Sequence, residues 1–326
     1  MKVVVASLNP AIERLLVVPT NTPGAVHRLT RSETLAGGKG VNVARVLQQL
    51  ATPEFAISDT ERVLSPILVG PLGGPTGELQ AALMTAENLE AETVAISEWT
   101  RVNEVLVDQS DPENATVYNA VGPVLDDAER EALHALAATS IDDATFVICT
   151  GSLPPGLPSG FYADWIRAAR AAGVPSLLDA HGAALAYGAE AVPTIVKVNR
   201  DELADLASAA STSSEKLVSK WLQDGTETVI ITNGSGSAQA RTSMEVLEIV
   251  PPRVNTRSSV GSGDAFTAGL VWSFLHHPHS SWAQHLTVGA ACGASNATNT
   301  VARLSSEHPP RALVSDVVVR ENRVRD

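Results

Sequence analysis

Short runs of hydrophobic residues alternate along this chain with longer segments whose apolar positions recur with a helical period. The short runs, most of them rich in β-branched residues and bounded by turn formers, predict strands at residues 3–8, 67–70, 145–150, 175–179, 195–198 and 228–232. Helical patterns lie at residues 41–50, 77–88, 128–138, 160–172, 201–208 and 214–224. This alternation predicts βαβ units, and hence an α/β fold with a mostly parallel sheet covered by helices on both faces.

Two segments depart from this rhythm. Residues 11–33 and 91–121 carry alternating patterns, most clearly from Arg101 to Asp108, followed by polar residues 109–114 and then by 115–118. This pattern predicts a hairpin outside the main sheet. We expect the two segments to form a small β lid over the carboxyl ends of the strands, while residues 1–10, 34–90 and 122–326 form the core. Residues 52–64 are expected to be a surface loop. The segments 263–275 and 282–299 are rich in Ala, Gly and Val, and we expect them to form two closely packed helices.

Composition narrows the class of protein. The chain has 326 residues, of which 44% are hydrophobic and 18% charged, so a large core is expected and a mainly disordered chain is excluded. A net charge of −13 argues against nucleic acid or an anionic membrane as partner. No run approaches the ~18 apolar residues of a membrane span, and the run 3–8 stops at Asn9 and Pro10 before a secretory signal would be complete. With its cysteines, Cys149 and Cys292, inside apolar runs, a reducing, cytoplasmic setting is expected.

The strongest local motif is a small, flexible turn, residues 260–263, that runs into a helix. Its glycines let the backbone N–H groups of Gly261, Ser262 and Gly263 point the same way, and the helix N-terminus adds partial positive charge, so the turn can hold an anion. Asp264 could act beside that anion. Taken alone, however, the motif is explained better by a carboxylate that only satisfies the helix dipole.

Three further motifs are ambiguous when taken singly. A Gly-Gly-Lys-Gly turn at residues 37–40 feeds a helix that carries Asn42, without the spacing of a P-loop or a dinucleotide fold. Asn199 and Glu202 follow a strand on one helical turn, where they could order hydrated Mg²⁺ or simply form a capping box. Residues 230–237 are a strand opening into a small-residue loop, which suits a nucleobase or a plain hairpin turn.

The order of these motifs is more informative than any one of them. Together with Asn9–Glu13, Thr100–Asn103 and Thr150–Gly156, they resemble the ribokinase-like PfkB carbohydrate kinases over roughly residues 2–300. The resemblance is closest to the branch of 1-phosphofructokinases and tagatose-6-phosphate kinases. It implies a three-layer α/β/α core with a small β-sheet lid, and ATP and Mg²⁺ as cofactors. The implied reaction is phosphorylation of a ketohexose phosphate. Fructose 1-phosphate is the first choice of acceptor, and tagatose 6-phosphate or fructose 6-phosphate the next.

The resemblance also implies roles for single residues. Asp264 would be the catalytic base, beside an anion hole formed by Gly261, Ser262 and Gly263. The nucleotide would be contacted by Lys197, Asn199, Thr232, Gly234, Ser259 and either Asn299 or Asn296, with Mg²⁺ held through water by Asn199 and Glu202. The acceptor would be bound by Glu13, Gly38, Lys39, Asn42 and Arg101, with Arg28 assisting. Arg101 would hold the phosphate already on the sugar, which suits a guanidinium.

Some residues depart from the branch pattern. Glu13 stands where Asp is usual, Val198 where Pro is usual and Asn233 where an apolar residue is common. These changes leave open a non-catalytic sensor of the same fold, or a kinase of an unphosphorylated sugar. None of them touches Asp264. A homodimer through the lid is also expected, because a short sheet built from two segments needs its apolar face covered.

Overall fold

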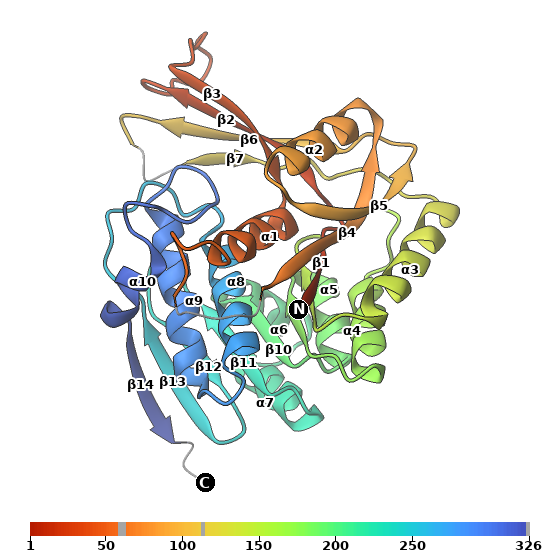
Figure 1. Ribbon diagram of the computed structural model, residues 1–326, viewed down its shortest axis with the longest axis vertical. Coiled ribbons are helices and arrows are strands. Elements are labelled where there is room, and N and C mark those ends of the chain that lie inside the picture. Colours follow the sequence, from red (N-terminus) through yellow and green to blue (C-terminus); the bar gives the residue numbers. More distant parts are fainter. Residues whose placement is uncertain (58–62, 112–114, 324–326) are drawn as a thin grey trace.

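The largest element is a ten-stranded sheet in this computed structural model, which describes residues 1–57, 63–111 and 115–323 (Figure 1). Its strands are β1 (Lys2–Ala6), β4 (Ser65–Gly73), β5 (Glu90–Ile96), β8 (Phe146–Thr150), β9 (Ser176–Asp179), β10 (Ile195–Asn199), β11 (Thr228–Thr232), β12 (Ala238–Arg241), β13 (Glu245–Val250) and β14 (Val318–Arg323). The order is β14-β13-β12-β11-β10-β9-β8-β1-β4-β5. Pairing is parallel from β5 to β11 and antiparallel from β11 to β14, so the predicted mostly parallel sheet is confirmed.

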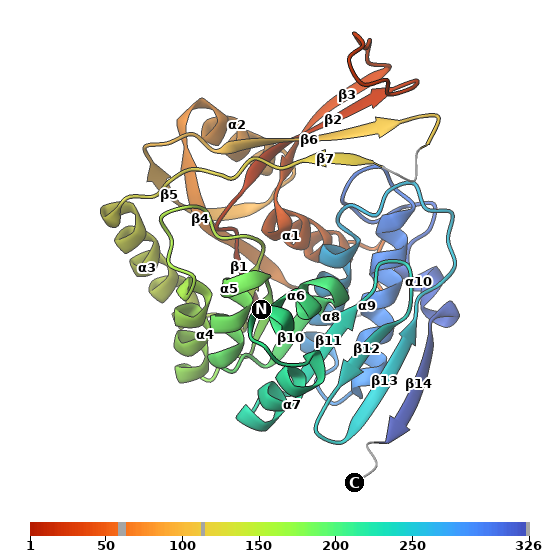
Figure 2. The ribbon, with the colours of Figure 1, turned by 180° about the vertical axis from the view of Figure 1, so that it is seen from behind.

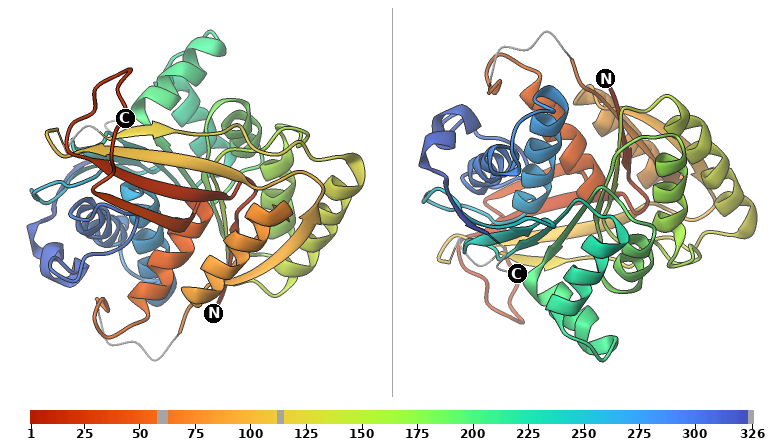
Figure 3. Two further views of the ribbon diagram at one scale, coloured as in Figure 1. Left: turned by 90° about the horizontal axis from the view of Figure 1, so that it is seen from above. Right: turned by 90° about the horizontal axis from the view of Figure 1, so that it is seen from below.

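Helices cover both faces of this sheet, as Figures 1 and 2 show. They are α1 (Lys39–Leu50), α2 (Gly74–Ala86), α3 (Asp127–Asp142), α4 (Phe161–Ala171), α5 (Gly182–Glu190), α6 (Arg200–Ala209), α7 (Ser214–Asp224), α8 (Ser262–His276), α9 (Trp282–Ala297) and α10 (Pro310–Leu313), followed by the 3₁₀ turn η1 (Val314–Asp316). Alternate residues of β1 point to opposite faces of the sheet. Val3 and Val5 belong to the apolar cluster that includes residues of α1, α8 and α9, whereas Val4 belongs to the cluster that includes residues of α3 to α7. The end-on views in Figure 3 show the resulting three layers.

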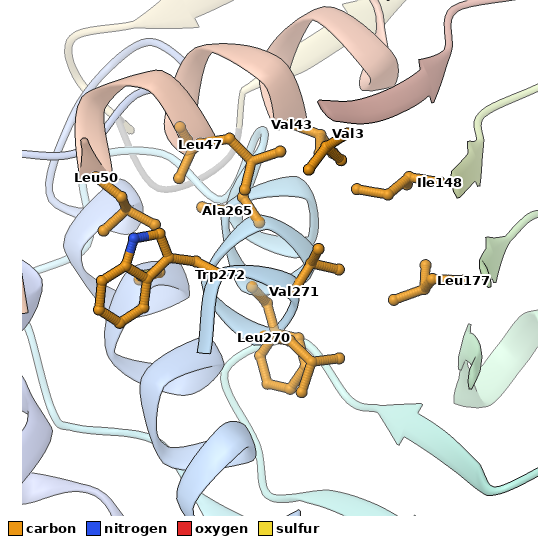
Figure 4. Close-up of a cluster of buried hydrophobic side chains, with 14 of the residues drawn as sticks. Val3, Val43, Leu47, Leu50, Ile148, Leu177, Ala265, Leu270, Val271 and Trp272 are labelled. Carbon is orange, nitrogen blue, oxygen red and sulfur yellow. The ribbon is translucent and has the colours of Figure 1, made fainter. Parts of the chain in front are cut away.

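The layer under α1 and α8 is a dense apolar core. Figure 4 shows Val3, Ile148 and Leu177 of the sheet on the side of α8 where Val271 lies. Helices α8 and α9 pack closely, because a Cβ added to Gly269 would lie 2.6 Å from the sulfur of Cys292. The predicted pair of closely packed helices is therefore present. Cys149 and Cys292 are both buried free thiols.

A separate four-stranded sheet forms the lid at the top of Figure 1. Its strands, in the order β3-β2-β6-β7, are β2 (Ala11–Val18), β3 (Arg31–Gly37), β6 (Arg101–Asp108) and β7 (Thr116–Tyr118). Strands β6 and β7 pair antiparallel, which is the predicted hairpin; residues 112–114 of its turn lie outside the described residues. Strand β2 pairs in parallel with β6, so segments far apart in the sequence build one sheet.

The structure differs from the sequence-based expectations in several places. Residues 91–96, expected in the lid, instead belong to β5, which pairs in parallel with β4 at the edge of the main sheet because α2 returns the chain there. Residues 34–37, expected in the core, extend β3 within the lid. Helix α5 and strands β12, β13 and β14 were not predicted. Residues 58–62 of the predicted loop 52–64 lie outside the described part. None of the helices in the described residues is long and apolar enough to cross a membrane.

Candidate active site

A cavity of about 630 Å³ is lined both by the lid and by the carboxyl ends of the parallel strands. This is the edge where open α/β sheets place their ligands. Most of the predicted site residues line it: Glu13, Gly38, Lys39, Asn42, Arg101, Lys197, Asn199, Glu202, Thr232, Gly261, Gly263 and Asp264. Residues from distant parts of the chain therefore converge on one hollow.

Asp264 lies in the first turn of α8 and is only 5% exposed. Its carboxylate accepts a hydrogen bond of 2.9 Å from Nδ2 of Asn42, at the start of α1. The side chain thus reaches across to another helix, rather than serving only its own helix terminus. Burial raises the pKa of Asp264 to about 6, assisted by the charge of Asp179 and opposed by Lys39 and the Asn42 hydrogen bond.

The turn before Asp264 is held in one conformation. Gly261 has a φ of +79°, and a Cβ at this position would lie 2.4 Å from the Cβ of Ala302. Asn296 donates from Nδ2 to the carbonyl of Val260 at 2.8 Å and to the hydroxyl of Ser262 at 3.2 Å. The turn therefore presents the N-terminus of α8 to the cavity as a preformed place for an anion.

Asp179, which sequence analysis missed, organises the cations of the cavity. It accepts a 2.6 Å hydrogen bond from Nζ of Lys197 and lies 3.5 Å from Nζ of Lys39. Burial alone would raise the pKa of Asp179, but the two lysines outweigh it and hold that pKa at about 2. In return, Asp179 raises the pKa of Lys39. The ammonium group of Lys39 is thus kept charged where an anion would enter.

The lid side of the cavity carries Arg101 and Glu13. Arg101 donates from Nη1 to the carbonyl of Ala120 and from Nη2 to that of Asn9, each at 2.7 Å. Its buried Nε–H has no partner among the described residues, which leaves a donor for a ligand. Burial raises the pKa of Glu13, with Asp264 acting in the same direction and Arg45 opposing.

Asn199 and Glu202 form the capping box of α6 and also line the cavity. Asn199 Oδ1 accepts from the Glu202 amide at 2.8 Å, and Glu202 Oε2 accepts from the Asn199 amide at 3.1 Å. One oxygen of the carboxylate is therefore used and Oε1 remains. Mg²⁺ usually keeps several waters and binds one or two carboxylates plus substrate phosphates. This pair fits that chemistry, whereas no cluster of three or more His, Cys, Asp or Glu side chains within the described residues could cage a metal.

Other predicted residues lie outside the cavity lining. Arg28 is exposed in the loop between β2 and β3. Gly234 lies in the β11–β12 turn, closed by a bond from the Gly236 amide to the Asn233 carbonyl. Ser259 and Ser262 flank the lining residues Val260 and Gly261, Asn296 is buried behind the turn, and Asn299 donates to the Arg303 carbonyl at 2.9 Å. For Asn296 the geometry indicates a brace for the turn rather than a nucleotide contact.

The cavity also contains polar residues that sequence analysis did not assign. They are Ser7, Asn9, Asn103, Asn119, Thr150, Ser152, Asp179 and His181. For Asp179 a signal was present: it is the last residue of a predicted buried strand, at the edge where ligands bind. Asn9 instead bridges the carbonyl of Val121 and the hydroxyl of Ser152, a contact between loops that no local pattern encodes.

Comparisons with known proteins agree with this architecture. The family model "pfkB family carbohydrate kinase" matches residues 3–309. A 1-phosphofructokinase of Xanthomonas campestris is 31% identical over 286 residues, covering 84% of this chain and 85% of that protein. A tagatose-6-phosphate kinase of Staphylococcus epidermidis is 26% identical over 276 residues, covering 83% and 84%.

Among solved structures, phosphofructokinase-2 from Escherichia coli in complex with substrates and products superposes with a TM-score of 0.82 at 25% identity, covering 97% of this chain and 99% of that one. The expected ribokinase-like fold, with its mostly parallel sheet and small separate sheet, is confirmed. The family model spans nearly the whole length of the chain. The chain therefore belongs to the pfkB family of carbohydrate kinases.

Proposed function

We propose that this kinase transfers the γ-phosphoryl group of ATP to a hydroxyl of a ketohexose phosphate, with Asp264 as the base. One observation carries the proposal: a buried carboxylate faces the cavity between an amide-lined helix N-terminus and the ammonium groups of Lys39 and Lys197. Phosphoryl transfer needs such positioning and charge neutralisation more than covalent participation by the protein.

Each group has a defined part in the step. The ionised carboxylate of Asp264 accepts the proton of the sugar hydroxyl as its oxygen bonds to the γ-phosphorus. The bond from that phosphorus to the bridging oxygen breaks, and ADP leaves with the electron pair. A pKa of about 6 keeps Asp264 mostly ionised at neutral pH, yet close enough to it for efficient proton transfer.

The transferring group would lie against the amides of Gly261 and Gly263 at the N-terminus of α8, whereas the Ser262 amide donates to the Ser259 carbonyl at 3.2 Å. Lys39 and Lys197 would offset the charge on its oxygens. Mg²⁺, held through water by Asn199 and Glu202, would neutralise further charge on the ATP phosphates. Thr232 lines the same side of the cavity, where the nucleotide would lie, with Gly234 and Ser259 nearby.

The acceptor would lie under the lid. Arg101, with its unpartnered Nε–H, would bind the phosphate already on the sugar, and Glu13 would bind sugar hydroxyls. Fructose 1-phosphate is the first choice, because 1-phosphofructokinases are among the relatives at 29% and 31% identity. Tagatose 6-phosphate and fructose 6-phosphate follow, because their kinases are also among the relatives.

A coupled assay of ADP release tests the proposal. The panel holds fructose 1-phosphate, fructose 6-phosphate, tagatose 6-phosphate, free fructose and free tagatose. We expect rapid turnover with one of the three phosphates and little with the free sugars. Turnover with a free sugar alone would point to a kinase of unphosphorylated sugars. No turnover with any of the five would contradict the proposal and favour the non-catalytic sensor.

We also propose that the lid pairs two chains in a homodimer and that the protein works in the cytoplasm. On the lid face opposite Val105 and Val107, Leu16, Val102 and Leu106 alternate with polar residues, and Val102 is 37% exposed. A second copy of this sheet would cover that face. The buried free thiols of Cys149 and Cys292 suit a reducing compartment.

A further inference from the structure

Arg45 on α1 is a buried cation that the proposed chemistry does not use. Only 8% of its side chain is exposed, and its guanidinium pairs with Glu87, the C-cap residue of α2, through Nε and Nη2. A buried charge is tolerated only when it is paired and its remaining donors are bonded. The remaining N–H groups of Arg45 bond to residues close to Asp264.

The other donor bonds of Arg45 go to three residues near Asp264, one on its own helix, one in the loop after α9 and one in β3. Nη1 donates to Oδ1 of Asn42 at 2.9 Å and to the carbonyl of Ala302 at 3.1 Å. Nη2 donates to the carbonyl of Ala36, in lid strand β3, at 2.5 Å. Ala302 is the residue whose Cβ abuts Gly261 in the anion-binding turn. Arg45 thus contacts both the residue that bonds Asp264 and the residue that packs on the turn before it.

The contact with Asn42 fixes the direction of an amide. An arginine side chain can only donate hydrogen bonds, and an ionised carboxylate can only accept them. Asn42 lies between Arg45 and Asp264, so its oxygen must face the guanidinium and its NH₂ group the carboxylate. The opposite orientation would place oxygen against carboxylate and NH₂ against guanidinium, and both contacts would be repulsive.

We propose that Arg45 is a positioning residue for phosphoryl transfer, which holds the Asn42 amide so that its NH₂ group always donates to Asp264. The proposal rests on the proposed role of Asp264 as base. The Asn42 hydrogen bond favours the ionised form of Asp264, the form that accepts the proton. Without Arg45, only the carboxylate itself holds the amide, the hydrogen bond to Asp264 is weakened, and a larger fraction of the base is protonated at neutral pH.

Other charges also act on Asp264 and must be held constant in any test. Lys39 on α1 and Lys197 on β10 favour its ionised form, and Asp179 on β9 opposes it. Glu13 on β2 also interacts with Asp264 across the cavity. The test therefore leaves these four residues unchanged and alters only the hydrogen bonds that join Arg45 to Asn42 and Asn42 to Asp264.

NMR titration of the Asp264 carboxyl carbon, whose signal is assigned with Asp264→Asn, measures the pKa of Asp264 without any substrate. Asn42→Ala should raise the pKa of Asp264 by about one unit, because it removes a hydrogen bond from the charged form, and Arg45→Met should raise it by up to the same amount, because it weakens that bond. The double variant should shift the pKa no further than Asn42→Ala alone. An unchanged pKa in Arg45→Met, or shifts that add in the double variant, would overturn the proposal.

Glu87→Gln is the matched control. It removes the ion pair of Arg45 but keeps the bonds to Asn42, so we expect a lower melting temperature and no change in the Asp264 pKa. A shift in Glu87→Gln equal to that of Arg45→Met would reduce Arg45 to a structural role and overturn the proposal. Should Arg45→Met not fold, Arg45→Met with Glu87→Met leaves no unpaired buried charge, and the same upward shift is required of it. Failure of the wild type to phosphorylate any sugar would remove the proposed function but not this contact.

Discussion

At the scale of single residues, the site shows how neighbours set the behaviour of one chemical group. Asp179 and Asp264 are both buried carboxylates, yet the pKa of the first is held at about 2 and that of the second is raised to about 6. The difference arises because Asp179 touches two ammonium groups, whereas Asp264 is left with one neutral donor. The first is a permanent anion that orders cations, and the second can exchange a proton.

This difference predicts the pH dependence of turnover. Because the pKa of Asp264 is raised, its ionised form is lost as pH falls through about 6, and kcat should fall about tenfold per unit below that value. Measurement of kcat from pH 5 to 8 at saturating substrates checks this. Sugar phosphates also titrate near pH 6, so Asn42→Ala is the control: it leaves the substrate unaltered and should move the acid limb upward. A kcat that is flat down to pH 5 would contradict the role of Asp264.

Arg101→Ala should raise the KM for the sugar phosphate far more than the KM for ATP. The expected rise is roughly 10- to 100-fold, because a hydrogen bond to a charged group contributes ~1.5–3 kcal/mol. Arg167→Ala is the control, since Arg167 is exposed on α4 and pairs with Asp164 outside both the cavity and the lid. Equal rises in both KM values for Arg101→Ala, or an equal effect of Arg167→Ala, would contradict the assignment.

At the scale of elements, the turn that opens α8 connects backbone geometry to chemistry. Gly261→Ala adds a methyl group at φ +79°, 2.4 Å from the Cβ of Ala302. We expect a loss of stability of about 1–3 kcal/mol and a fall in kcat of about 100-fold, as the amides shift from the anion. Thermal unfolding and steady-state kinetics measure the two effects.

Gly160→Ala is the control for that variant, because Gly160 has a φ of −81° and open space where the Cβ would lie. Its stability should change by less than about 0.5 kcal/mol, with unchanged kcat. A Gly261→Ala enzyme with wild-type kcat would show that the turn does not hold the transferring group.

Element prediction succeeded where local pattern and tertiary role agree. The parallel strands are apolar runs between turn formers, and the predicted bounds of the helix Ser214–Asp224 coincide with those of α7. Helix α5 was missed because its Ala- and Gly-rich sequence has no distinct apolar face. Strand β12, which pairs with β11 and β13, was missed because four residues are too few to show a clear alternation. Strand β5 was predicted to belong to the lid, because an alternation of apolar and polar residues indicates a strand but does not reveal which sheet that strand joins.

At the scale of the whole molecule, the site exists only because the fold brings distant segments together. Asn42 and Asp264 are separated by 222 residues, and Lys39 meets Asp179 across the cavity. The order of motifs predicted most of the residues that line the cavity, since each motif is local. The contacts among them depend on tertiary packing, and so the bonds of Arg45, Asn296 and Asn9 could not be predicted.

The proposed dimer belongs to this scale. Light scattering at micromolar concentration should give twice the chain mass, and Leu106→Lys, which charges the outer face of the lid, should shift it toward the monomer. Met244→Lys is the control, because Met244 is 79% exposed in the β12–β13 turn, far from the lid in sequence and fold. A wild type that is monomeric throughout would contradict the dimer.

The most direct test of the whole account is the kcat of Asp264→Asn with the best acceptor of the panel. We expect it to fall by about 10²- to 10⁴-fold, the usual contribution of a positioned base, with the KM for ATP little changed. Asp201→Asn, which removes an exposed carboxylate from the first turn of α6, should keep wild-type kinetics. An Asp264→Asn enzyme that turns over at nearly the wild-type rate would contradict the central claim that this buried carboxylate takes up the proton of the sugar hydroxyl.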